Sequence, residues 1–143
     1  MKNKLNTYEN KLLVLMSITF GLVFVDRMAL TYLSPYLIKD LGLNNAQLGM
    51  LVSGLSLTWA ISGYISTSWA EKHNKKKLVF VGAVILFSLS SISSALATTF
   101  TILLITRLLM GLSEGPTLPL IQSFIAKESS KNRIGFNMGF LQS

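Results

Sequence analysis

Long, nearly uninterrupted runs of apolar residues dominate the hydrophobic pattern of this chain. Four of them cover about residues 12–33, 46–70, 78–97 and 101–125. Each is close to or above the ~20 residues that an α-helix needs to cross the hydrocarbon core of a bilayer. Another apolar stretch begins at about residue 134. The pattern predicts an all-α, polytopic membrane protein with four transmembrane helices and the start of a fifth.

Composition supports a membrane protein and excludes several other classes. Half of the 143 residues are hydrophobic and only 13% are charged, which is too apolar for a soluble domain of this size. The chain has no cysteine, and its single histidine, His73, lies in a lysine-rich loop. We therefore expect no disulfide, no metal site and no cofactor. A secretory signal peptide is disfavoured because Asp26 and Arg27 stand where cleavage would occur.

The basic residues that give the chain its net charge of +7 are distributed unequally between the two ends of the predicted helices. Ten basic residues flank the helices on one side: Lys2, Lys4, Lys11, Lys72, Lys75, Lys76, Lys77, Lys127, Lys131 and Arg133. Only Lys39 lies on the other side. This asymmetry predicts a multi-pass protein of the cell membrane with a cytoplasmic N-terminus. It also suits anionic lipid headgroups, and we expect no nucleic-acid partner.

Four charged residues fall inside the predicted helices: Asp26, Arg27, Arg107 and Glu114. Each costs about 2.5–3.5 kcal/mol near the centre of a transmembrane helix, so something must compensate. Counted from the outer helix ends, the first three lie at one depth of roughly 10 Å and Glu114 at roughly 20 Å. Ion pairs that only fix helix register are one explanation. Four charges on two helices favour a shared polar cavity.

The predicted helix over residues 101–125 contains small residues and prolines beside Glu114. Gly111 and Gly115 permit close helix packing, whereas Pro116 and Pro119 remove hydrogen-bond donors and bend the helix. We expect a helix deformed around a binding site. The serines of the preceding helix are interpreted as packing residues; they are Ser88, Ser90, Ser91, Ser93 and Ser94.

The loop over residues 67–77 combines one acid with several lysines. The topology accounts for the lysines but not for the adjacent Glu71 and Lys72. We interpret the loop as a cytoplasmic gate in which ion pairs break and re-form as the cavity opens inward. Its gating residues are Glu71, Lys72, Lys76 and Lys77.

Three motifs together resemble the major facilitator superfamily, and most of all its anion:cation symporter family. The superfamily loop pattern Gly-x-x-x-Asp-Arg/Lys-x-Gly-x-Arg/Lys-Arg/Lys corresponds to Thr67, Glu71, Lys72, Asn74, Lys76 and Lys77. The pattern Arg-x-x-x-Gly-x-x-Glu-Gly-x-x-x-Pro is met in full by Arg107, Gly111, Glu114, Gly115 and Pro119. The pattern Tyr-x-Asp-Arg-x-Asn is reduced to Phe24, Asp26, Arg27 and Ala29.

The resemblance implies a secondary transporter that moves a small organic anion, such as a sugar acid, together with H⁺. Substrate-binding residues would be Arg27, Arg107 and Trp59, and proton-coupling residues would be Glu114 and then Asp26. Protonating an acid would free an arginine to grip a carboxylate. Residues 1–143 would form part of an N-terminal six-helix half, lacking the C-terminal half that completes the site.

Other interpretations stay open at this point. The chain is a fragment, a truncated reading frame, or a small membrane interaction protein derived from a transporter and without transport activity of its own. An enzyme is not expected, because no Ser/His/Asp or Cys/His set, metal-ligand spacing or P-loop is present.

Overall fold

The computed structural model describes the backbone of residues 2–142 and the side chains of residues 8–29 and 31–141. The side chains of Lys2 and Lys4 therefore lie outside the described residues. Every regular element in the described part of the chain is a helix, so the all-α prediction is confirmed. The helices are α1 (Lys2–Leu41), α2 (Asn45–Lys72), α3 (Lys76–Ala95), α4 (Phe100–Glu114), α5 (Thr117–Glu128) and α6 (Ile134–Gln142).

Three of these helices are long and apolar enough to cross a membrane, within the described residues. The candidate spans are Tyr8–Ala29 in α1, Asn45–Lys72 and Lys76–Ala95. Helix α1 is longer than the predicted 12–33, because hydropathy marks only the part suited to hydrocarbon while the helix continues on both sides. It ends before Gly42, whose φ of 63° a glycine adopts without strain.

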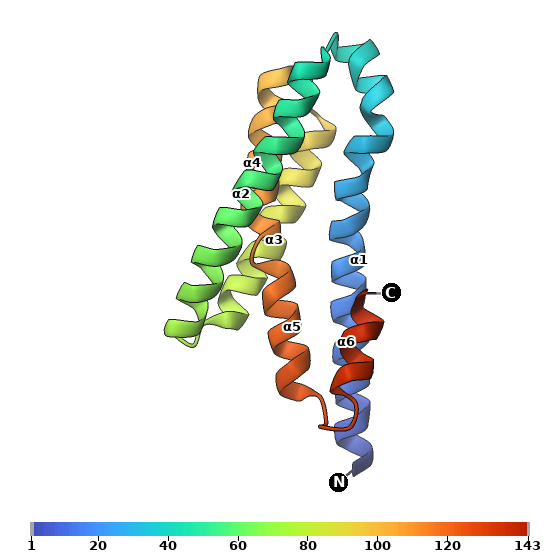
Figure 1. The fold of residues 1–143 in the computed structure, drawn as a ribbon, viewed down its shortest axis with the longest axis vertical. Coiled ribbons are helices and arrows are strands. Elements are labelled where there is room, and N and C mark those ends of the chain that lie inside the picture. Colours follow the sequence, from blue (N-terminus) through green and yellow to red (C-terminus); the bar gives the residue numbers. More distant parts are fainter. Residues whose placement is uncertain (1, 143) are drawn as a thin grey trace.

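Helices α2, α3 and α4 form one packed group, and α1 runs alongside it (Figure 1). Helix α4 contacts both α2 and α3, whereas α1 is held mainly by α5 and α6. An apolar cluster of α1, α5 and α6 contains Leu13, Met16, Ile121, Ile125 and Leu141. A second cluster closes the opposite end and contains Leu43, Leu51 and Leu103.

Helices α2 and α4 approach each other at glycine. A Cβ placed on Gly115 would lie 2.5 Å from the carbonyl oxygen of Trp59 and 2.6 Å from the amide nitrogen of Gly63. A Cβ on Gly111 would collide with Thr58. Ser62 adds a hydrogen bond between the helices by donating its hydroxyl to the carbonyl oxygen of Gly111 at 3.1 Å. The two predicted packing glycines therefore set how closely α4 lies against α2.

The predicted helix 101–125 is divided into α4 and α5, which corrects the expectation of one bent helix. Pro116 and Pro119 cannot donate to the carbonyl oxygens four residues earlier, so the regular hydrogen-bond ladder fails between the two helices. Thr117 partly compensates, because its hydroxyl donates to the carbonyl oxygen of Ser113 at 2.9 Å. The break lies directly after Glu114.

Candidate functional site

A partly buried ion pair joins α1 to α4. Nη1 of Arg107 lies 3.5 Å from Oδ2 of Asp26. Helix α3 supplies two further contacts: Ser91 donates its hydroxyl to Oδ1 of Asp26 at 3.0 Å, and Nη2 of Arg107 donates to Oγ of Ser94 at 3.2 Å. Asp26 and Arg107 thus lie next to each other, as their matched positions in the predicted helices led us to expect. Below we call these four residues the ion-pair network.

The network neutralises a charge that would otherwise be costly inside the membrane. Arg107 is only 6% exposed, and the carboxylate of Asp26 compensates its charge. Within the described residues, Nε of Arg107 has no hydrogen-bond partner. Among the described residues, the guanidinium therefore binds Asp26 and Ser94.

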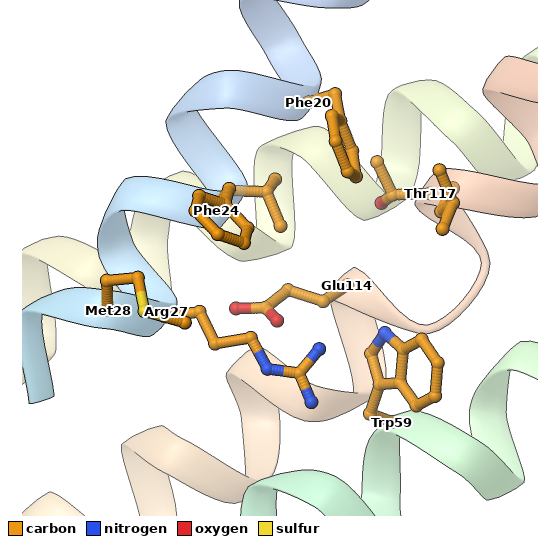
Figure 2. Close-up of a pocket in the computed structure, with 9 residues that line it drawn as sticks. Phe20, Phe24, Arg27, Met28, Trp59, Glu114 and Thr117 are labelled. Atoms are coloured by element: carbon orange, nitrogen blue, oxygen red, sulfur yellow. The ribbon is translucent and has the colours of Figure 1, made fainter. Parts of the chain in front are cut away.

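A separate cavity of about 320 Å³ lies between α1, α2, α4 and the start of α5. Its charged residues are Arg27 from α1 and Glu114 from α4, which point toward the same space in Figure 2. The rest of its wall is largely aromatic and aliphatic: Phe20, Val23, Phe24, Met28, Trp59, Thr117 and Leu118. The cavity thus combines one cation and one acid with an extensive apolar surface.

Glu114 and Arg27 are held in different ways. Glu114 is only 2% exposed, and neither of its carboxylate oxygens has a hydrogen-bond partner in the described part of the chain. The guanidinium carbon of Arg27 lies 5.1 Å from the ring centre of Trp59, a cation–π contact (Figure 2). No carboxylate among the described residues lies within ion-pair distance of Arg27.

The structure brings only some of the predicted site residues to this cavity. Arg27, Trp59 and Glu114 line it. Asp26 and Arg107 do not, because they face α3 and bind each other there. Assigning Arg107 to direct substrate binding stays a prediction, and it now requires that the guanidinium leave Asp26 first.

Two contributors to the ion-pair network were missed by sequence reasoning. The sequence pattern suggests a packing role for Ser91 and Ser94, but both bind the charged pair. A signal was available, because counting from the outer end of the third helix places them roughly 5–9 Å deep, near the depth of Arg107. Ser88 and Ser93 donate to carbonyl oxygens of their own helix.

The loop between α2 and α3 forms an ion pair other than the one suggested by adjacency. Nζ of Lys76 lies 2.9 Å from Oε1 of Glu71 and donates to the hydroxyl of Ser123 in α5 at 2.7 Å. Lys72 and Lys77 are exposed. Asn74 adopts a φ of 53°, a conformation that Asn tolerates better than most residues, at a position where the superfamily pattern has glycine.

Helices of membrane-spanning length around buried, mutually compensating charges define a multi-pass membrane protein with an internal polar site. The family model of the Major Facilitator Superfamily matches residues 15–143, and the chain belongs to this superfamily.

Two relatives illustrate the range of proteins to which the chain is similar. The quinolone resistance protein NorA of Staphylococcus aureus (strain MRSA252) is 29% identical over 134 residues, covering 94% of this chain and 34% of NorA. The hexuronate transporter of Bacillus subtilis (strain 168) is 37% identical over 93 residues, covering 65% of this chain and 22% of the transporter. The chain spans about a third of the length of NorA.

Proposed function

We propose that the chain contributes the N-terminal part of a secondary transporter that moves a small organic anion together with H⁺. The observation that carries this proposal is a buried carboxyl group without a partner, Glu114, in the same cavity as an arginine without a carboxylate partner among the described residues, Arg27. Such a cavity offers one group for a proton and another for an anion.

Arg27 is the residue best placed to bind the anion. Trp59 holds its guanidinium through the face of the indole ring, so the N–H donors stay available for a substrate carboxylate. The relative from Bacillus subtilis is named for hexuronate, a sugar acid, which fits this role. The aromatic wall from Phe20 and Phe24 adds room for an apolar part of the substrate, and the NorA relative is named for quinolone resistance.

Proton coupling is assigned first to Glu114 and second to Asp26. A proton on Glu114 removes its negative charge from the cavity that the anion must enter, so proton and substrate binding favour each other. A proton on Asp26 would release Arg107 from its ion pair and allow it to turn toward substrate. Glu114 is therefore our first choice for the residue that carries the coupling proton, and Asp26 is the second.

The topology proposed with this function has a cytoplasmic N-terminus in the cell membrane. The loop between α2 and α3 then lies at the cytoplasmic end, where Lys76 ties Glu71 to Ser123 of α5. Breaking this contact would separate the loop from α5, and we assign gating to Glu71, Lys72, Lys76 and Lys77 on that basis.

The test is Glu114→Gln in the complete transporter, assayed in proteoliposomes with a hexuronate as substrate. Glutamine keeps the side-chain shape but takes up no proton, so we expect loss of pH-driven accumulation with retained exchange of labelled for unlabelled substrate. Asp40→Asn, which changes an exposed acid near the end of α1, is the control and should accumulate normally. Undiminished accumulation by Glu114→Gln would refute the assignment.

A further inference from the structure

A second cavity, of about 730 Å³, lies at the end of the bundle opposite the loop over residues 42–44. Helices α1, α3 and α5 line it, together with Asn74. None of the residues of the ion-pair network and none of the residues around Glu114 contribute to it. It is therefore distinct from the proposed transport site. Below we call it the basal cavity.

Two of the three helices that line the basal cavity, α3 and α5, change from charged to apolar residues in the same direction. The first residues of α1 and α3 and the last residues of α5 lie at the same end of the bundle (Figure 1). From that end inward, α3 passes from Lys77 to Val81, and α5 passes from Lys127 to Phe124. Helix α1 continues the apolar wall with Leu15. The cavity thus has a charged mouth and an apolar interior.

The charge at the mouth favours an anion. Three lysines and one glutamate line the cavity, which leaves a net charge of +2. Lys76 is engaged by Glu71 and Ser123, but no ion pair is formed by Lys77 or Lys127 among the described residues. Both of these lysines are exposed. Two ammonium groups are thus available for an anionic group.

The apolar wall selects among anions. Leu15 and Val81 are 59% and 46% exposed, so the chain leaves this part of the wall uncovered, whereas Met16 of the same wall is buried. A small soluble anion would use the lysines but leave the wall bare. A phospholipid uses both, because its phosphate and its acyl chains follow the same order from the membrane surface inward.

We propose that the basal cavity binds one anionic phospholipid, with the headgroup at Lys77 and Lys127 and an acyl chain along the wall containing Leu15 and Val81. The site fixes the lipid between α1 and α3. The lipid thereby joins α1, which packs loosely, to the group of α2, α3 and α4.

The test is native mass spectrometry of the 143-residue chain in detergent, titrated with dioleoylphosphatidylglycerol or dioleoylphosphatidylcholine. We expect tighter binding of phosphatidylglycerol. Each surface lysine contributes about 5-fold, so Lys77→Gln/Lys127→Gln should weaken phosphatidylglycerol binding by about 25-fold and leave phosphatidylcholine binding unchanged. The double variant Lys11→Gln/Lys131→Gln carries the same charge change on exposed residues outside the cavity and should keep the preference.

A second pair of variants tests the wall. Leu15→Gln should weaken binding of the long-chain lipid, whereas Ile18→Gln, an equally exposed residue of α1 outside the cavity, should not. Equal binding of both lipids by the unaltered chain, or equal losses in the two lysine double variants, would overturn the proposal. Displacement of the long-chain lipid by inorganic phosphate alone would also overturn it, in favour of a soluble-anion site.

Discussion

Asp26 has two partners on two helices: Arg107 of α4 and Ser91 of α3. The cost of placing charge inside a membrane is met here by pairing, and the serine hydroxyls satisfy part of the remaining hydrogen-bonding capacity. Glu114 lacks such partners within the described residues. One of the two acids, Asp26, is thus held in an ion pair, whereas the carboxyl group of Glu114 is available to bind a proton or a ligand.

The ion pair between Asp26 and Arg107 leads to a prediction about the stability of the protein. Asp26→Ala leaves the guanidinium of Arg107 buried and uncompensated, and should lower the free energy of unfolding by about 2 kcal/mol. This is less than the about 3–5 kcal/mol of a fully buried pair, because Asp26 is partly exposed. In a double-mutant cycle with Arg107→Ala, followed by SDS titration, we expect a coupling of about 1 kcal/mol or more. Additive losses would show that the two side chains do not interact.

Glycine residues allow helix α4 to lie directly against helix α2. Its backbone lies against that of α2 at Gly63 and Gly115, where any side chain would force the helices apart. Directly beyond this contact the chain breaks into α5, so Glu114 occupies the last turn of a helix that is fixed on one side and interrupted on the other. The arrangement sets the height of Glu114 relative to Trp59 of α2.

A pair of glycine variants tests this at the scale of helices. Gly115→Ala brings a methyl group against the backbone of α2 and should destabilise the protein by about 1–3 kcal/mol. Gly82→Ala in α3 meets nothing within 4 Å and should stabilise by about 0.5–1 kcal/mol through its better helix propensity. Thermal unfolding in detergent, followed by circular dichroism, measures both. Equal effects of the two changes would contradict the close packing of α2 and α4.

The whole molecule has two chemically different ends. The loop between α2 and α3 and the segment after α5 carry most of the basic side chains, whereas the opposite end carries Lys39. Both basic segments lie at the end of the bundle where α1 begins (Figure 1). The charge asymmetry found along the sequence is therefore also an asymmetry in space, as a protein oriented by its positive charges requires.

Because the chain has no cysteine, single introduced cysteines can test the proposed orientation with a cytoplasmic N-terminus. We expect Ala46→Cys, near the start of α2, to react with a membrane-impermeant maleimide added outside intact cells. Lys131→Cys, in the segment between α5 and α6, should react only after the cells are opened. Both positions are exposed in the structure, so burial within the chain does not limit labelling. The reverse pattern would place the N-terminus outside.

The sequence alone located the apolar spans and the charged residues inside them, but not the break of the predicted helix 101–125 into α4 and α5. Continuous hydropathy and the need to compensate buried charge located the spans and the pairing of Asp26 with Arg107. The hydropathy pattern did not predict which direction a side chain takes around its helix, and this direction decides which partner the side chain contacts. Asp26 and Arg27 are neighbours in sequence, yet their side chains serve different environments, one facing α3 and the other Trp59. Hydropathy does not encode that separation, and it also missed the two serines of α3.

The contact between Gly63 and Gly115 has a mechanical consequence. Two backbones that touch without intervening side chains have no compressible layer between them, so α2 and α4 are expected to travel as one unit. A motion that opens one side of the protein and closes the other would then require another helix to move relative to α2 and α4. We expect this helix to be α1, because it is sparsely packed. Arg27 would then move with α1, while Trp59 and Glu114 would keep their positions relative to each other in the unit of α2 and α4.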